Sequence, residues 1–191
     1  HQVLIMTEQA PYGLLAELET VKDKGLPPVH LWHPESVKDI DMLIQRDGSW
    51  LYMGSPITRQ RLVRLFSTVL RKDGDEYFLV TPVEKNRIRV EDVPFQAVLL
   101  QSSGSGGSQR LTFTTDMAEQ VVADERHPLR FEFDEETGEP SPYVMVRDGL
   151  EARLVRSVYY QLAELVEEKA ISGENWLGLW SDGTFFKLQR A

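Results

Sequence analysis

Basic side chains next to a turn are the residues of this sequence best suited to binding chemistry. The stretch from Thr81 to Arg87 passes through a proline turn and presents Glu84, Lys85 and Arg87 close together. Ammonium and guanidinium groups placed in this way pair with the anionic oxygens of a ligand. The alternative is a charged hairpin in which Glu84 pairs with Lys85 or Arg87, and surface pairs of that kind contribute at most about 1 kcal/mol. Both interpretations stay open.

A second group of basic residues lies along the face of a predicted helix and just beyond it. It consists of Arg59, Arg61, Arg64, Arg71 and Lys72, in a chain that is otherwise acidic. The group is either a solvated helix face that pairs with acidic residues of the second half, or a set of arginine forks that recognises phosphate.

Tryptophan adds a possible stacking surface to these charges. Core packing is the default for a tryptophan near a strand, but Trp32 lies in an aromatic-rich extended segment and is the best candidate to stack on a base. We therefore predict one stacking contact and five anion-pairing contacts with a ligand, namely Trp32, Arg46, Arg59, Lys85, Arg87 and Arg147.

Catalytic and metal-binding patterns are weak in comparison. His30 and His33 lie near several carboxylates, but neighbouring prolines favour extended chain, so we expect no metal site. The carboxylate pair Asp39 and Asp41 would need opposed environments to act as acid and base, and no pattern indicates them. Ser55 does not lie in a nucleophile elbow. We expect no catalytic residue and no cofactor, although enzymatic activity stays an open alternative.

Composition excludes several classes of protein. The chain has 191 residues, a net charge of −9, 41% hydrophobic residues and no cysteine. The hydrophobic content supports a folded core, and the negative charge argues against a nucleic-acid coat or an anionic-membrane binder. Thiolate chemistry is excluded. There is no apolar run of about 18 residues and no signal peptide, so we expect a cytoplasmic protein that starts naturally at Met6.

The elements that would position these side chains alternate between hairpins and helices. We predict a helix over residues 12–24, ended by Gly25, and extended chain over 30–34. Hairpins are predicted for residues 41–46 with 49–53, 129–133 with 143–146, and 176–180 with 184–188. Further strands are predicted at residues 77–82, 86–90 and 95–101. The pattern is that of an α+β protein with antiparallel sheets.

An internal repeat suggests that the two halves share one design. The sequence RLVR at 61–64 recurs at 153–156, and each copy carries the spacing of an amphipathic helix. In the first half Ser55 is a predicted helix cap and Pro56 the first helical residue. In the second half Asp148 and Glu151 have the spacing of a capping box. We predict two similar lobes, each made of antiparallel strands and one amphipathic helix; the alternative is a single α+β domain with a coincidental motif.

The Gly/Ser-rich stretch over residues 102–108 divides these halves. It lacks the ending of a phosphate-binding loop, so we interpret it as a flexible linker or a hairpin tip. The predicted organisation is an N-terminal helix and extended segment (1–35), a first α+β lobe (36–101), a linker (102–108) and a second α+β lobe (109–191).

An ordered series of short motifs resembles a known family. The motifs are PPVHLW (27–32), DIDM (39–42), RDGSW (46–50), GSPI (54–57), LVRLF (62–66), YFLVTPVEK (77–85), VEDVPF (90–95), HPLRF (127–131) and WSDG (180–183). The series resembles the bacterial domain-of-unknown-function family 1285. That resemblance implies a duplicated α+β architecture, a second lobe similar to a pleckstrin-homology barrel, a nucleotide-like ligand between the halves and a role in signalling. The chain departs from the family at residues 33–38 and 102–108.

Three functional hypotheses follow from these features. The leading one is a non-enzymatic regulatory module that binds a small anionic, nucleotide-like ligand between its lobes. The first alternative is a protein-interaction scaffold that uses its outer strands or the acidic stretch 134–139 to bind a partner protein. The second is a nucleotide-directed hydrolase or transferase. We expect neither nucleic acid nor a membrane as a partner.

Overall fold

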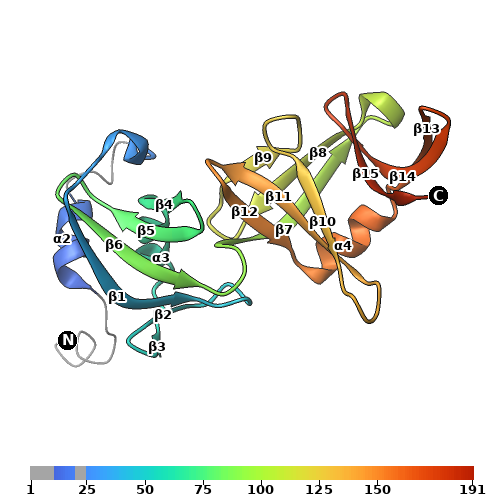
Figure 1. The fold of residues 1–191 in the computed structure, drawn as a ribbon. Coiled ribbons are helices and arrows are strands. Elements are labelled where there is room, and N and C mark those ends of the chain that lie inside the picture. Colours follow the sequence, from blue (N-terminus) through green and yellow to red (C-terminus); the bar gives the residue numbers. More distant parts are fainter. Residues whose placement is uncertain (1–10, 20–24) are drawn as a thin grey trace. The chain divides into compact units, whose positions relative to one another are not determined.

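The computed structural model describes residues 11–19 and 25–191, and the chain divides into two compact units (Figure 1). The first lobe is His1–Pro94 and the second lobe is Phe95–Ala191. The division lies in the short connection between β6 (Glu84–Val90) and β7 (Phe95–Ser103). The predicted start at Met6 and the predicted helical residues 20–24 lie outside the described residues.

A six-stranded sheet forms the first lobe, with the strand order β3-β2-β1-β6-β5-β4. In addition to β6, its strands are β1 (Ser36–Ile44), β2 (Trp50–Tyr52), β3 (Ser55–Pro56), β4 (Leu70–Asp73) and β5 (Glu76–Val80). The lobe also contains α2 (Tyr12–Glu19), the 3-10 turn η2 (Val29–Leu31) and α3 (Gln60–Ser67). The segment predicted as extended over 30–34 therefore begins as a 3-10 turn.

Helix α3 closes the core of the first lobe. It is strongly amphipathic, and its buried residues include Val63 and Phe66. The Phe66 ring stacks on the ring of Trp50 in β2, with 6.5 Å between centroids and 19° between planes. Both side chains are buried, so Trp50 is a core residue and is not available to stack on a ligand.

The second lobe contains another six-stranded sheet and a three-stranded sheet. The larger sheet has the order β10-β11-β12-β7-β8-β9, and the smaller one has the order β13-β14-β15. The strands are β7, β8 (Arg110–Thr115), β9 (Gln120–Val122), β10 (Leu129–Phe133), β11 (Pro140–Arg147), β12 (Leu150–Leu154), β13 (Glu167–Ile171), β14 (Glu174–Ser181) and β15 (Thr184–Arg190). Helix α4 (Arg156–Ala163) connects the two sheets.

The two six-stranded sheets share one strand order. Counted along the chain within each lobe, the order is third, second, first, sixth, fifth and fourth strand when the first sheet is read from β3 and the second from β9. In both sheets the first and last strands pair in parallel, β1 with β6 and β7 with β12, whereas the other pairs are antiparallel. The prediction of two similar α+β lobes is confirmed, and the prediction of purely antiparallel sheets is wrong because of these central pairs.

The RLVR repeat does not mark equivalent positions. In the first lobe, residues 61–64 lie inside α3, which connects the third strand to the fourth. In the second lobe, Arg153 and Leu154 end β12, the sixth strand, and only Arg156 belongs to α4. The predicted helix starts are also wrong, because Ser55 and Pro56 form β3. The four shared residues thus adopt different structures in different surroundings.

An Asp-Gly turn explains why the helix start predicted at residues 148–151 of the second half is wrong. Asp148 and Gly149 both have positive φ, at 47° and 82°, and they connect β11 to β12. A two-residue hairpin turn of type I′ needs this conformation at both positions, and Asp-Gly suits it. Asp182 and Gly183 form the same turn between β14 and β15. Asp148 is therefore a turn residue, and Glu151 lies in a strand instead of completing a capping box.

The Gly/Ser-rich stretch forms a hairpin tip within the second lobe. Residues 102 and 103 end β7, and the 3-10 turn η3 (Gly106–Ser108) leads into β8. Ser105 and Ser108 bond to each other's backbone as a capping box. Gly104 has φ +72°, and an added Cβ would lie 2.4 Å from the carbonyl oxygen of Ser108. Of the two interpretations considered for this stretch, the structure matches the hairpin tip.

None of the helices in residues 11–19 and 25–191 is both long and apolar enough to cross a membrane.

Candidate functional site

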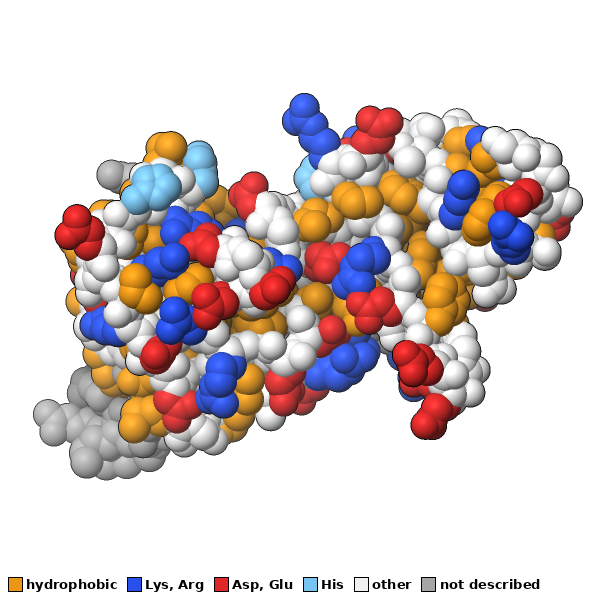
Figure 2. Space-filling model, viewed as in Figure 1, with side chains coloured by type: hydrophobic (Ala, Val, Ile, Leu, Met, Phe, Trp, Pro, Cys, Tyr) orange, Lys and Arg blue, Asp and Glu red, His pale blue; other side chains and the backbone are white. Residues whose placement is uncertain are grey.

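The predicted ligand contacts Lys85 and Arg87 lie on one strand face of the first lobe. Cross-strand register brings Arg71 opposite Phe78, Phe78 opposite Arg87, and Arg87 opposite Asp39. We call this row, with Asp73, Glu76 and Lys85, the charged face. Figure 2 shows basic and acidic side chains interspersed over the β1, β6 and β5 region of the first lobe.

Each base of the charged face already has a carboxylate partner. The Nζ atom of Lys85 lies 2.7 Å from Asp73 and 4.1 Å from the centroid of the Phe78 ring. Arg87 places its Nη1 2.6 Å from Asp39 and its Nε 2.8 Å from Glu76. An anionic ligand would have to displace these carboxylates. The observed pairing therefore favours a structural role for these bases over the ligand interpretation. The partner expected for the charged hairpin is wrong, however, because Glu84 pairs with Lys38 at 2.8 Å instead of with Lys85 or Arg87.

Arg71 links the charged face to Trp32. Its Nη1 donates to the backbone carbonyl oxygens of Val29 and Trp32, both at 2.7 Å, and its guanidinium pairs with Asp73. Only 13% of the Arg71 side chain is exposed, so it anchors η2 against β4. The Trp32 backbone is thus held in place, and its ring is half-buried.

Asp73 connects two of these bases, and its ionisation should affect the stability of the first lobe. Burial alone would raise the pKa of its carboxyl, but hydrogen bonds from Arg71 and Lys85 and their charges leave the pKa lowered. As pH falls, Asp73 therefore binds a proton at a higher pH in the unfolded chain than in the folded one. The stabilisation that the Asp73 ion pairs give to the folded state is present above the unfolded pKa of about 4, and it is lost as pH falls through the native pKa.

We therefore expect Asp73→Asn to lower the free energy of unfolding at pH 7 by about 1 kcal/mol, and the loss to shrink below pH 4. Urea unfolding at pH 7 and pH 3 measures this difference. Asp75→Asn, at an exposed neighbouring position, is the control and should cause no pH-dependent change. A loss that is equal at both pH values would contradict the ion-pair explanation.

The other predicted contacts lie elsewhere in the fold. Arg46 follows β1, and its Nη1 lies 3.3 Å from Asp92, while its backbone N–H donates to Glu91 at 2.8 Å. Arg59 is the exposed N-cap residue of α3. Arg71 and Asp73 connect the Trp32 backbone to Lys85, and the Phe78 ring lies beside both Lys85 and Arg87. The contacts described above do not extend to Arg46 or Arg59.

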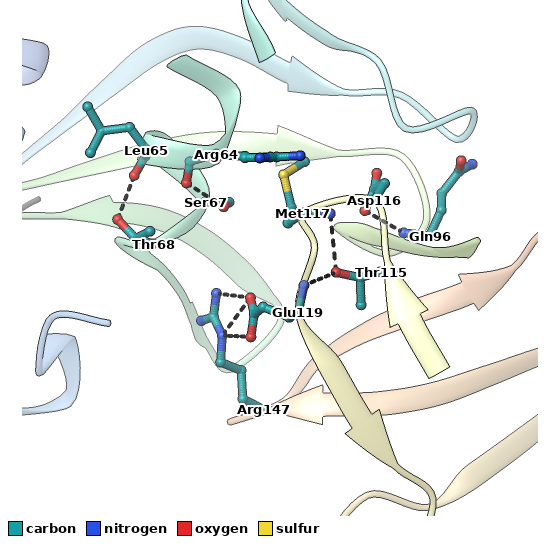
Figure 3. A network of polar contacts seen from close by, with 10 residues as sticks. All are labelled: Arg64, Leu65, Ser67, Thr68, Gln96, Thr115, Asp116, Met117, Glu119 and Arg147. Atoms are coloured by element: carbon teal, nitrogen blue, oxygen red, sulfur yellow. Dashed lines mark hydrogen bonds and ion pairs between the residues drawn. The ribbon is translucent and has the colours of Figure 1, made fainter. Parts of the chain in front are cut away.

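Arg147, in the second lobe, forms a bidentate ion pair with a carboxylate. Its Nε and Nη2 each bond to Glu119 at about 3.0 Å, as Figure 3 shows. Glu119 belongs to the turn between β8 and β9, in which the Thr115 hydroxyl accepts the backbone N–H of both Met117 and Glu119. Only 16% of the Arg147 side chain is exposed. This geometry indicates a bridge between β11 and that turn.

A pocket in the second lobe brings together arginines that sequence reasoning did not select. It has a volume of about 210 Å³. It lies where the loop after β10, the start of β11 and the junction of β12 with α4 meet. Its lining residues are Asp134, Glu139, Pro140, Ser141, Pro142, Arg153, Leu154, Arg156 and Tyr159. We call it the arginine pocket.

The positive charges of the arginine pocket come from two successive elements. Arg153 lies in β12, and Arg156 is the first residue of α4. Val155, the N-cap of α4, makes no side-chain cap, and the first turn contains no acidic residue. The exposed Arg156 side chain donates to the Tyr160 hydroxyl at 3.2 Å. That bond and the charge of Glu139 raise the pKa of Arg156, and a guanidinium group is a cation at neutral pH in any surroundings.

The two acidic residues of the pocket, Asp134 and Glu139, differ in their hydrogen bonding and exposure. The Asp134 carboxylate accepts the backbone N–H of Glu136 and of Thr137, each at 2.9 Å. These bonds lower the pKa of Asp134 and commit one of its oxygens to the turn. The Glu139 side chain is exposed, it lines the same pocket as Arg156, and its negative charge acts on that arginine. The pocket thus has an intrinsic competitor beside its arginines.

The sequence did contain a signal for this pocket. The pair Asp148-Gly149 is the same hairpin signal as Asp47-Gly48, and after it Leu150, Ala152 and Leu154 alternate with polar residues. A strand over 150–154 places Arg153 and Arg156 in different elements. Interpreted as part of one amphipathic helix, both arginines are expected on its solvated polar face, which gives no reason to expect a pocket.

Comparisons with known proteins find a matching family model for each lobe. The model described as "Domain of unknown function (DUF1285), N-terminal domain" matches residues 27–93, and "Protein of unknown function (DUF1285), C-terminal domain" matches residues 94–188. A DUF1285 crystal structure from Silicibacter pomeroyi DSS-3 is 50% identical, with a TM-score of 0.84 over 93% of this chain and 95% of that chain. One from Shewanella baltica OS155 is 28% identical, with a TM-score of 0.52 over 66% and 92%. A comparison with curated proteins finds no match.

Proposed function

The chain belongs to the DUF1285 family, and from that premise and the arginine pocket we propose that it is a non-enzymatic module whose second lobe binds a small anionic ligand. One observation carries the proposal: two guanidinium groups from successive elements, Arg153 and Arg156, line a single pocket at the start of α4. Guanidinium forks match the geometry of carboxylate and phosphate groups. The first turn of a helix adds backbone N–H donors and the positive end of the helix dipole.

The charged face of the first lobe supports ligand binding less well. Lys85 and Arg87 are already satisfied by Asp73, Asp39 and Glu76. In the arginine pocket, by contrast, the carboxylate whose charge acts on Arg156 belongs to the exposed side chain of Glu139. Moving an exposed side chain costs less than breaking a half-buried pair, because its charge is already largely hydrated.

The proposal makes opposite predictions for two neighbouring charges. We expect Arg156→Gln to weaken the binding of an anion by about ten- to a hundredfold, since a hydrogen bond to a charged group is lost. We expect Glu139→Gln to strengthen it several-fold, because a competing carboxylate is removed while its backbone bonds to Asp134 and Thr137 remain.

Amide NMR titration of the full chain with inorganic phosphate and with AMP, in phosphate-free buffer, measures these effects. Arg126→Gln is the matched control, because Arg126 is an exposed arginine of the same lobe outside the arginine pocket. Unchanged binding in Arg156→Gln, or weaker binding in Glu139→Gln, would overturn the proposal. AMP binding far tighter than phosphate binding would support a nucleotide-like ligand.

We also propose that the lobes arose by duplication of a six-stranded unit. The support is their shared strand order with a central parallel pair. The equivalent strands are then β1 and β7, β2 and β8, and so on, instead of the segments around the RLVR motifs. A pleckstrin-homology-like second lobe stays a prediction, and its support is that two sheets and one helix pack in one compact unit. A cytoplasmic location also stays a prediction.

A further inference from the structure

A second, apolar pocket adjoins the arginine pocket. The two share Pro140 and Tyr159 as lining residues. The apolar pocket has a volume of about 60 Å³, and polar atoms contribute little to its wall. Its lining residues are Phe131, Pro140, Tyr159, Leu162, Ala163, Val166, Leu179 and Leu188. The binding region thus has a charged compartment and an apolar compartment, with Pro140 and Tyr159 in the walls of both.

The walls of the apolar pocket come from both sheets of the second lobe and from the helix between them. Phe131 comes from β10 of the larger sheet, and Leu179 and Leu188 come from the smaller sheet. Leu162 and Ala163 end helix α4, which connects the two sheets. Leu162 and Leu179 are buried, at 2% and 1% exposure, so the base of the pocket is fixed by the core. Ala163 is exposed and lies at its rim.

We propose that the ligand is a dissolved amphiphilic anion, a phosphate or carboxylate that carries a short acyl, alkyl or aryl group. This inference rests on the proposed function, because the arginine pocket binds the charged group. The apolar pocket then binds the neighbouring carbon atoms, which reach it past Tyr159. A small apolar site removes a few carbon atoms from water, and a longer chain extends back into solvent.

The proposal predicts a dependence on chain length. Each methylene group transferred from water into an apolar site contributes about fourfold in affinity. Affinity should therefore rise from inorganic phosphate through ethyl phosphate to butyl phosphate, and it should level off at hexyl and octyl phosphate because the pocket is small. Binding that is independent of chain length would overturn the inference and leave the anion proposal intact.

Isothermal titration of the full chain with this series is the test, and Ala163→Trp is the informative variant. The indole group should fill the rim of the apolar pocket and abolish the gain from ethyl and butyl groups, with little effect on inorganic phosphate. Ala170→Trp, at an exposed position of β13, is the control and should retain the chain-length dependence. A thermal melt of each variant verifies folding.

The remaining outcomes separate the two proposals and the sources of the ligand. Arg156→Gln should weaken every member of the series by a similar factor. If Arg156→Gln has no effect while chain length still matters, the proposed function fails. If Ala163→Trp retains the chain-length dependence, the apolar pocket is not the site and this inference fails. Co-sedimentation with phosphatidylglycerol vesicles that Ala163→Trp abolishes would overturn the assignment to a dissolved ligand in favour of a lipid.

Discussion

Phe66→Ala should lower the free energy of unfolding of the first lobe by about 3–5 kcal/mol, the range found when a buried phenylalanine is truncated. Phe66 has no exposed surface, and its ring stacks on Trp50. It is the largest buried side chain of α3, so its loss removes most of the apolar area that holds the helix to the sheet. The backbone of Trp50 would keep its pairing with β1, whereas its ring would face a cavity.

Urea unfolding followed by tryptophan fluorescence measures this loss. Arg61→Ala is the matched control, because Arg61 lies on the exposed side of the same helix. We expect it to change the free energy of unfolding by less than about 0.5 kcal/mol. A Phe66→Ala variant that is less than about 1 kcal/mol below the native protein would show that α3 contributes little to the core.

Gly178→Ala should destabilise the second lobe by about 2–3 kcal/mol, the upper part of the range for overpacked sites. An added Cβ would lie 2.4 Å from the carbonyl oxygen of Phe186 and 2.6 Å from the ring of Phe185. The first of these atoms is backbone, so it cannot rotate away. The Phe185 ring is further constrained by its edge-to-face contact with Trp180, at 5.2 Å between centroids.

The change at Gly178 should also reach the apolar pocket. Strands β14 and β15 must separate to admit the methyl group, and they carry Leu179 and Leu188 of the pocket wall. Thermal unfolding measures the loss of stability, and titration with butyl phosphate measures the loss of the chain-length effect. Gly107→Ala is the control, because no atom lies within 4 Å of its added Cβ and its φ is not in the left-handed region. Equal stabilities of the two variants would contradict the close packing at Gly178.

Local signals in the sequence predicted the hairpins well. The Asp-Gly pairs at 47–48 and 182–183 connect the strands that they were expected to connect. The β10–β11 hairpin and its long loop are also confirmed. A two-residue turn is determined by its own backbone conformation, and strand alternation by the neighbouring residues, so both can be recognised without knowledge of distant contacts.

Repetition of sequence was a less reliable guide than turn chemistry. The RLVR motif predicted two equivalent helices, but one copy lies in a helix and the other spans the end of a strand. Four residues contain too little information to specify an element, because tertiary packing overrides their local preference. The parallel pairs β1–β6 and β7–β12 join strands far apart in the chain, and no local pattern indicates them.

Residue types alone identified which side chains carry charge, but not which of them are already paired. Lys85, Arg87 and Arg147 were selected as anion-binding residues, and the fold provides each of them with a carboxylate from another strand or turn. The pairing depends on register across the sheets, which is a long-range property. Arg153 and Arg156 gained significance only when the turn at 148–149 placed them at the edge of one pocket.

The α+β class, the main hairpins, the amphipathic character of α3 and the membership of the family could all be recognised from the amino-acid sequence, because they follow from local periodicity, turn chemistry and an ordered set of motifs. The central parallel pairs, the division between Pro94 and Phe95, and the arginine and apolar pockets became visible in the folded chain alone. These features arise from contacts between residues that are distant in the chain, and the free energy of such contacts depends on the packing of the whole lobe.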